Sequence, residues 1–283
     1  MSNENIDIEM CAKPKQIAET FARKSMPAKV SYGKIKTLVL AIAAGAFISF
    51  GAQASLTAMA GTEAVAFGLA KILGGMIFSA GLMMIVFTGA ELFTGNVLIG
   101  ISVLEKKISI DKLFRNWFWV YIGNFIGAII VATLIHYANA YHGTNEVLGV
   151  LGLKVAYGKV NLTFTQALAS GILCNWLVCM AVWMAAAAKD VSGKIWAILF
   201  PITAFAMCGY EHCVANMYMI TNGLLNKTSE AVVVASGFTA EQLSTLSIKA
   251  FLIDNLIPVT LGNIIGALIF VVGTFWLAYM KRK

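Results

Sequence analysis

Charged residues are scarce in this chain of 283 residues: only 12% are Asp, Glu, Lys or Arg, about half the share of an ordinary soluble domain. Hydrophobic residues make up 59%, and the mean hydropathy is +0.79. This composition excludes an ordinary soluble domain and predicts a polytopic protein of the lipid bilayer. The net charge of +7 does not indicate nucleic-acid binding, because the basic residues lie between apolar runs rather than in a motif or on one face.

Histidine is rare and the cysteines form no metal-binding pattern. With three histidines and no Cys-x-x-Cys pair, a metal cluster is hard to assemble, and we expect neither a metal nor a cofactor. Four of the five cysteines lie in apolar runs, where we expect small buried hydrophobic side chains. These four are Cys174, Cys179, Cys208 and Cys213. The N-terminus lacks the basic-then-apolar order of a signal peptide, so we expect no cleavage.

Six apolar segments are long enough to cross a bilayer, which takes about 20 residues. They lie near residues 36–57, 68–103, 113–139, 162–188, 194–225 and 250–280. Of the 21 Lys and Arg residues, 16 lie in the N-terminal arm, the 104–115 and 189–194 loops and the C-terminus. This bias predicts that both termini are cytoplasmic, with an arm of residues 1–34 followed by a membrane domain of residues 35–283.

The second and fifth segments each contain a Gly-x-Glu-x-x-x-x-Asn motif. Residues 89–96 read GAELFTGN and residues 209–216 read GYEHCVAN. A glutamate and glycine in the middle of an apolar run predict a broken helix, because unsatisfied backbone is tolerated at membrane depth only where it is buried in protein or lines a cavity. Two breaks at corresponding places indicate a binding or conduction site at the membrane midplane.

A second pair of motifs strengthens the internal repeat. Residues 123–128 read GNFIGA and residues 262–267 read GNIIGA, and each motif has a further asparagine eight residues before its own, at Asn116 and Asn255. Each half then holds three spans, at about 35–140 and about 160–280. An odd number of spans per half predicts an inverted repeat, so the expected fold is an all-α membrane protein of six helices in a 3+3 arrangement with broken second and fifth helices.

The ionisable residues inside the apolar segments are the candidates for chemistry. Glu91 and Glu211 occupy equivalent positions, two residues after Gly89 and Gly209, which favours a shared scaffold that accepts bonds from the backbone freed at each break. His212 has no ionisable counterpart, because Leu92 stands in its place. A histidine there can donate a hydrogen bond to an anion or exchange a proton with it.

A hydroxyl group and a set of large apolar side chains lie in or near the two breaks. Thr94 in the first break supplies a hydroxyl that could face His212. Large apolar side chains lie one or two turns from the breaks, and their helical spacing alone favours core packing. These are Phe78, Leu82, Phe93, Val178 and Phe205.

The chain resembles the formate/nitrite transporter family. The resemblance rests on four motifs in order: residues 89–96, residues 175–179 (NWLVC), residues 209–217 (GYEHCVANM) and residues 254–263 (DNLIPVTLGN). It extends from about residue 35 to residue 280. It implies an aquaporin-like protomer of six helices, a homopentamer in the bacterial plasma (inner) membrane, and a path for small anions through each protomer.

The resemblance also implies roles for single residues. Thr94, His212 and Asn216 would line the pathway together with Asn175, and Lys159 would draw anions into the outer vestibule and polarise the histidine. The five apolar residues near the breaks then become constrictions rather than core. Phe78 and Phe205 match the outer constriction, and Leu82, Phe93 and Val178 match the inner one.

The sequence leaves the substrate and other functions open. Residues 254–260 are most similar to formate channels, whereas residues 209–212 are also similar to nitrite channels, so formate is favoured over nitrite or hydrosulfide. A neutral-solute pore of the aquaporin type is the alternative that the paired breaks allow. An enzyme using Glu211 and His212 is disfavoured, because no nucleophile-base pair or metal-ligand spacing accompanies them.

Overall fold

The computed structural model describes residues 11–62, 64–139 and 146–281, and within these ranges the regular structure is helical apart from one isolated bridge between Cys11 and Ala188. Five helical segments are long and apolar enough to cross a membrane. They are α3 (Lys34–Met59), α4 (Phe67–Thr88), α7 (Ile110–Tyr137), α9 (Phe164–Ala187) and the segment Ala250–Tyr279. The last comprises a π-helical stretch, η3 (Ala250–Leu256), then α14 (Ile257–Ala267), η4 (Leu268–Gly273) and α15 (Thr274–Tyr279).

The second and fifth membrane segments, which begin with α4 and α10 (Val191–Met207), are broken helices, as the sequence predicts. After α4 the helix resumes as α5 (Phe93–Asn96), a 3-10 turn, η2 (Val97–Ile99), and α6 (Gly100–Leu104). The second break separates α10 (Val191–Met207) from α11 (Cys213–Asn226). Gly89 and Gly209 end the preceding helices with φ of 72° and 71°, a left-handed conformation that an L side chain would strain. The glycine of each motif is therefore the helix stop.

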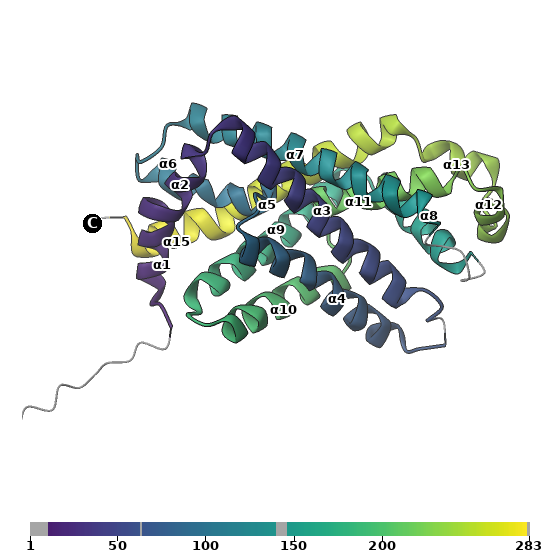
Figure 1. The fold of residues 1–283 in the computed structure, drawn as a ribbon, viewed down its shortest axis with the longest axis horizontal. Coiled ribbons are helices and arrows are strands. Elements are labelled where there is room, and N and C mark those ends of the chain that lie inside the picture. Colours follow the sequence, from purple (N-terminus) through teal and green to yellow (C-terminus); the bar gives the residue numbers. More distant parts are fainter. Residues whose placement is uncertain (1–10, 63, 140–145, 282–283) are drawn as a thin grey trace, which may run out of the picture.

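The helices pack in matching pairs, as an inverted repeat requires. In one half α3 packs on α7 and in the other α9 packs on α14, while α4 and α10 pack against each other along the lower side of the molecule in Figure 1. The GxxxG faces make close contact possible: a Cβ on Gly127 would lie 2.1 Å from the carbonyl oxygen of Ile42, and one on Gly266 would lie 2.3 Å from that of Ile172. These glycines bring the backbones of the paired helices into contact.

This packing predicts a position-dependent cost for adding a methyl group. Gly266→Ala should lower the free energy of unfolding by about 1–3 kcal/mol, because two helices must separate to admit the Cβ. Gly158→Ala is the matched control, since a Cβ at Gly158 meets nothing within 4 Å. Thermal unfolding of the purified proteins in detergent measures the difference. Equal midpoints for the two variants would contradict close packing at Gly266.

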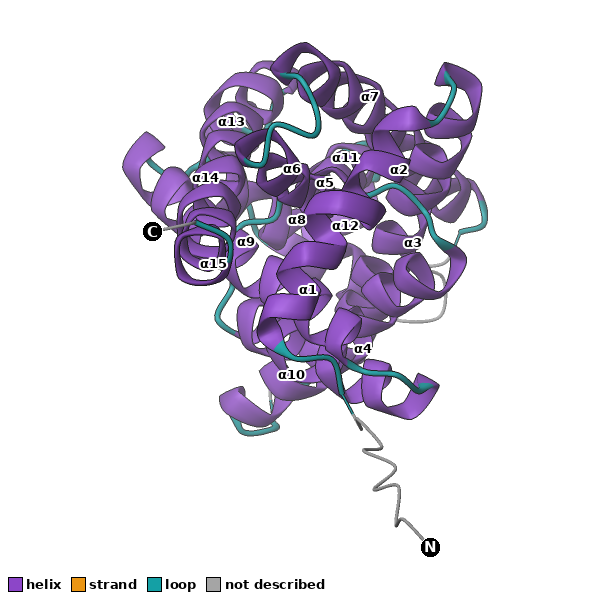
Figure 2. Ribbon diagram, turned by 90° about the vertical axis from the view of Figure 1, so that its left-hand side faces the viewer, coloured by secondary structure: helices purple, strands orange, loops and turns teal. Residues whose placement is uncertain are grey.

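Two helical elements outside the six predicted segments also occupy matching positions. The N-terminal arm is helical as α1 (Pro14–Thr20), a π-helical stretch, η1 (Phe21–Ser25), and α2 (Met26–Ser31), just before α3. Helix α8 (Val147–Val160), which we did not predict, precedes α9 in the same way. The arm lies at one end of the molecule and α8 toward the other (Figure 1), and α1 lies in front of the bundle in the end-on view of Figure 2.

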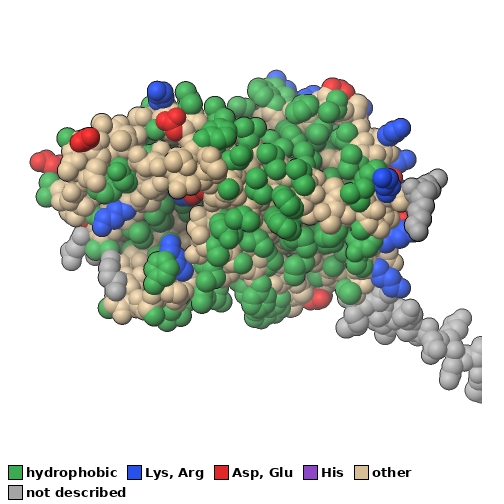
Figure 3. Space-filling view, turned by 180° about the vertical axis from the view of Figure 1, so that it is seen from behind, with side chains coloured by type: hydrophobic (Ala, Val, Ile, Leu, Met, Phe, Trp, Pro, Cys, Tyr) green, Lys and Arg blue, Asp and Glu red, His purple; other side chains and the backbone are tan. Residues whose placement is uncertain are grey.

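The exterior matches a bilayer environment. Apolar side chains cover the middle of the face in Figure 3, while most of the lysine, arginine and carboxylate side chains visible there lie toward the two ends. Two short helices, α12 (Glu230–Ser236) and α13 (Ala240–Thr245), lie at the end opposite the arm (Figure 1), and Thr239 forms a capping box with Gln242. The expectation for cysteine was wrong at one position, since Cys208 is exposed where α10 ends.

Candidate functional site

The first turns of the two half-helices that follow the breaks meet in the middle of the molecule. Thr94 lies in the first turn of α5, and His212 is the N-cap residue of α11. The hydroxyl oxygen Oγ1 of Thr94 lies 2.9 Å from Nε2 of His212, and both side chains are buried. Because helix N-termini carry partial positive charge, this meeting point favours a negative group.

The hydrogen bonds of His212 fix which ring nitrogen carries its proton. The backbone N–H of Ala215 donates to Nδ1 at 3.1 Å, so Nδ1 must present a lone pair. A neutral ring therefore carries its hydrogen on Nε2, where it can donate to the oxygen of Thr94. The cap that starts α11 thus aims an N–H donor at the centre of the molecule.

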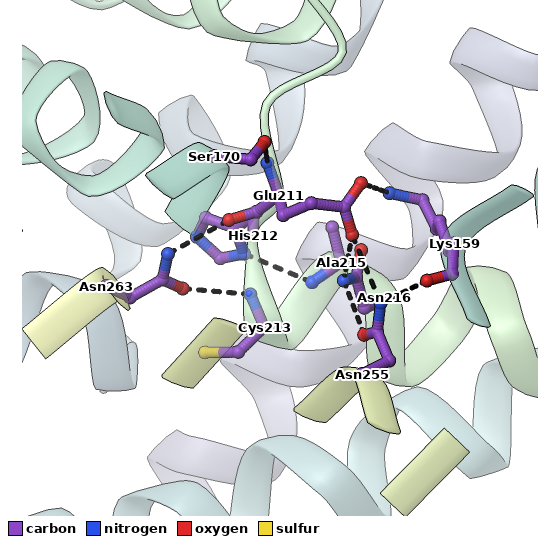
Figure 4. Close-up of polar contacts among 9 residues, drawn as sticks. All are labelled: Lys159, Ser170, Glu211, His212, Cys213, Ala215, Asn216, Asn255 and Asn263. Atoms are coloured by element: carbon purple, nitrogen blue, oxygen red, sulfur yellow. Dashed lines mark hydrogen bonds and ion pairs between the residues drawn. The ribbon is translucent and has the colours of Figure 1, made fainter. Parts of the chain in front are cut away.

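Glu211 lies beside His212 in a dense polar network (Figure 4). Its carboxylate accepts a bond from Lys159 Nζ at 2.7 Å and from Asn216 Nδ2 at 2.6 Å. Asn216 also donates to Asn255 Oδ1 at 2.8 Å, and Asn255 donates to the backbone carbonyl of Lys159 at 2.8 Å. The network ties the second break to α8 and to η3.

Glu91 has the same network on the other side, with a lysine that sequence reasoning missed. Lys29 Nζ donates to Glu91 at 2.6 Å and Asn96 Nδ2 donates to the second carboxylate oxygen at 2.6 Å. Asn96 also donates to Asn116 Oδ1 at 2.9 Å. Lys29 is therefore the counterpart of Lys159, and the arm is the counterpart of α8. The sequence contains one signal that could have identified Lys29: in each half, a lysine lies near the end of the segment that precedes the first membrane span.

The carboxylates bind side chains, which differs from the expectation that they would accept bonds from freed backbone groups. Asparagines satisfy the first N–H group of each half-helix instead. Asn124 Oδ1 accepts from the N–H of Phe93, and Asn263 Oδ1 accepts from the N–H of Cys213, each at 2.9 Å. The N–H of Glu211 donates to Ser170 Oγ at 3.0 Å. The asparagines of the paired motifs thus stabilise the non-helical backbone at each break.

Two cavities lie on either side of the Thr94–His212 contact. The loop-side cavity, of about 100 Å³, is lined by residues that include Lys71, Phe78, Lys159, Phe205, His212 and Asn216. The termini-side cavity, of about 300 Å³, is lined by residues that include Lys29, Leu82, Leu92, Gly95, Asn96 and Lys194. Each cavity contains two lysines, and a Lys-Glu pair stands at each. The arrangement can attract anions at both ends and present a hydrogen-bond donor between them.

Three of the five expected constriction residues line these cavities. Phe78 and Phe205 pack edge to face with ring centroids 5.5 Å apart, and the ring of Phe205 stacks over His212. Leu82 lines the termini-side cavity, joined there by Leu92, the position equivalent to His212. Leu92 was missed as a lining residue, although its place in the repeat marks it.

The other two constriction residues lie behind the cavities. Phe93 and Val178 are buried and line neither cavity, and the ring of Phe93 packs edge to face against Tyr121, with centroids 4.9 Å apart. This is core packing, as helical spacing alone indicated. Their assignment to the inner constriction stays a prediction of the resemblance.

Asn175 also lies behind the pathway residues. It is buried, lines neither cavity, and donates from Nδ2 to the backbone carbonyls of Thr94 at 3.2 Å and Asn263 at 2.7 Å. These bonds place the first break against α14. Among the described residues, no group of three His, Cys, Asp or Glu side chains could hold a metal ion.

Comparison with known proteins adds three findings. The family model described as formate/nitrite transporter matches residues 15–277. The formate channel FocA of Escherichia coli K12 is 39% identical over 257 residues, covering 90% of each chain, and the probable formate transporter of Methanothermobacter thermautotrophicus is 39% identical over 263 residues, covering 87% of this chain and 90% of the relative. A solved structure described as a pentameric formate channel with formate bound is similar at a TM-score of 0.79 and 36% identity, covering 88% of this chain and 98% of that one.

Proposed function

The chain belongs to the formate/nitrite transporter family, and from this premise we propose that it is a membrane channel for small monovalent anions whose substrate is formate. The observation that carries the proposal is the His212–Thr94 contact, which presents a buried donor between two lysine-lined cavities. The formate channels among its relatives and the structure described with formate bound support the choice of substrate.

Lysines at both ends concentrate the anion. Lys29 and Lys159 are each paired with a buried glutamate, so much of their charge is locally balanced. Lys71 and Lys194 line the two cavities without a described carboxylate partner, and they supply the excess positive potential. A cavity with a net positive charge raises the local concentration of a small anion.

The apolar residues beside the central pair act as a barrier to hydrated ions. Phe78 and Phe205 on the loop side and Leu82 on the termini side offer no hydrogen bonds to replace lost water. A bare anion pays a large desolvation cost there unless a donor compensates it. The donor that lies next to the aromatic pair is the imidazole of His212.

His212 acts in this proposal as a neutral hydrogen-bond donor. An arriving formate oxygen accepts from Nε2–H in place of, or together with, the hydroxyl of Thr94. An extra proton would have to enter at Nδ1, which already accepts from the N–H of Ala215. Proton exchange with the substrate therefore requires the cap bond of α11 to break.

The proposed setting is a homopentamer in the plasma (inner) membrane of a bacterium, with one pathway per protomer and both termini in the cytoplasm. The pentameric relative supports the assembly, and the excess of Lys and Arg on the termini side supports the orientation. The termini-side cavity is then the cytoplasmic vestibule, and the arm that carries Lys29 forms part of its wall.

A substrate panel in proteoliposomes tests the proposal. The full-length protein should carry formate faster than nitrite or hydrosulfide between about pH 5 and pH 8, the interval in which an ordinary histidine titrates. Protein-free liposomes are the control. Faster flux of nitrite or hydrosulfide would identify that anion, rather than formate, as the preferred substrate. Water flux without anion flux would instead identify a neutral-solute pore.

A further inference from the structure

A third cavity, separate from the pathway, lies where the arm joins α3 and packs beside α7. Its volume is about 390 Å³, and it shares no lining residue with the two pathway cavities. Its lining includes Tyr32, Lys34, Arg115, Asn116 and Trp119, and none of the described residues that line it carries a carboxylate. The arm, which supplies part of this lining, lies at the same end of the molecule as α15 (Figure 1).

Cations and aromatic rings frame this cavity. Lys34 Nζ lies 4.0 Å from the ring centroid of Trp119, and Lys36 Nζ lies 3.8 Å from that of Tyr32. Arg115 has no described carboxylate partner, and its guanidinium is suited to phosphate. Basic and aromatic side chains together are typical of a membrane-water interface.

One buried amide in the lining lacks an acceptor. Asn116 is 5% exposed, and its Oδ1 accepts from Asn96. In the other half, the equivalent Asn255 donates from Nδ2 to the backbone carbonyl of Lys159. Asn116 Nδ2 donates to none of the described residues. Because Asn116 lines the cavity, its Nδ2 amide can donate to an acceptor that is bound there.

We propose that this cavity binds the phosphate group of an anionic phospholipid. The phosphate oxygens would accept from Arg115, Lys34 and the free amide of Asn116. Apolar surface suited to acyl chains continues from the cavity along both helices of the single protomer: Ile35 and Val39 on α3 are 81% and 59% exposed, and Phe118 on α7 is 58% exposed. A free phosphate ion would use the cations but leave this surface uncovered, so the lipid is the better match.

Native mass spectrometry of the delipidated full-length protein, titrated with equal amounts of phosphatidylglycerol and phosphatidylcholine, tests the site. The wild type should retain phosphatidylglycerol preferentially. Lys34→Gln with Arg115→Gln should weaken its binding by about tenfold or more, since each basic residue contributes roughly fivefold near an anionic headgroup. Lys107→Gln with Lys112→Gln removes two exposed charges outside the cavity and should leave binding unchanged.

Two measurements keep the test decisive. An unchanged gel-filtration profile and formate flux show that the double variant is folded. Should it not fold, quenching of the wild-type tryptophans by brominated lipid replaces it: brominated phosphatidylglycerol should quench more than brominated phosphatidylcholine, and Trp119→Phe should remove the excess. Equal retention of both lipids, or displacement of phosphatidylglycerol by millimolar inorganic phosphate, would overturn the lipid assignment.

Discussion

Glu211→Gln should prevent the protein from assembling in its native form, and Glu91→Gln should have the same effect on the opposite half. Each carboxylate is almost fully buried and accepts from a lysine and an asparagine within 2.7 Å. A glutamine amide turns an acceptor into a donor that faces other donors and leaves the lysine charge uncompensated. Breaking a buried ion pair in this way costs about 3–5 kcal/mol, a large part of the stability of a typical protein.

Thermal unfolding and gel filtration in detergent measure this loss. Glu230→Gln is the matched control, because Glu230 is exposed at the start of α12 and should tolerate the change. Removing both charges with Lys159→Met and Glu211→Gln should recover part of the stability, since no unpaired charge is then buried. A Glu211→Gln protein that melts like the wild type but has lost formate flux would contradict the scaffold role and place the carboxylate in the transport step.

The breaks were predictable because their cause is local. A left-handed glycine followed by a glutamate inside an apolar run leaves few alternatives in hydrocarbon, and the structure stops α4 and α10 at these glycines. The sequence shows the asparagine pairs as a repeat, but it does not show which groups these side chains bind. That Asn124 and Asn263 bind the first N–H of each half-helix depends on helices brought together by tertiary packing.

Lys29 and α8 could not be found in the same way. Lys29 lies 62 residues before its partner Glu91, whereas Lys159 lies 52 residues before Glu211, so no constant spacing links the two pairs. Helix α8 carries no capping signal and lies outside the six apolar runs. Its role in holding Lys159 follows only from its packing against α11. The family resemblance identified Lys159 as a functional residue, but only the fold shows that the arm supplies its counterpart, Lys29.

The distinction between Phe93 and Leu92 depends on helix phase. Both residues lie at the first break, one position apart, and either could face the cavity on hydropathy alone. Leu92 is the N-cap residue in extended conformation and lines the termini-side cavity, whereas Phe93 begins α5 and points to Tyr121. The repeat contains this information, because Leu92 aligns with His212, which is the N-cap residue of α11.

Removing either member of the central pair should lower formate flux by about tenfold to a hundredfold. His212→Asn removes the imidazole donor but retains a side chain that can cap α11, and Thr94→Val removes the hydroxyl at nearly constant volume. A hydrogen bond to a charged group is worth about 1.5–3 kcal/mol, which corresponds to that range of rates. Flux of labelled formate into proteoliposomes measures it. Thr221→Val is the control, since this hydroxyl bonds only to a carbonyl within α11.

The pH dependence of these variants separates a hydrogen-bond donor from a proton carrier. If His212 stays neutral and donates from Nε2, His212→Asn should lower flux by the same factor at every pH. The reason is that Nδ1, the nitrogen that would have to take up a proton, accepts a hydrogen bond from the N–H of Ala215 throughout transport. If the ring instead passes a proton to formate, the variant should lose flux mainly at high pH, where protonated substrate is scarce, and its flux should fall more steeply with rising pH than that of the wild type. A steeper fall with normal assembly would show that the Ala215 bond opens in each cycle, and the break would then act as a proton relay rather than as a fixed donor.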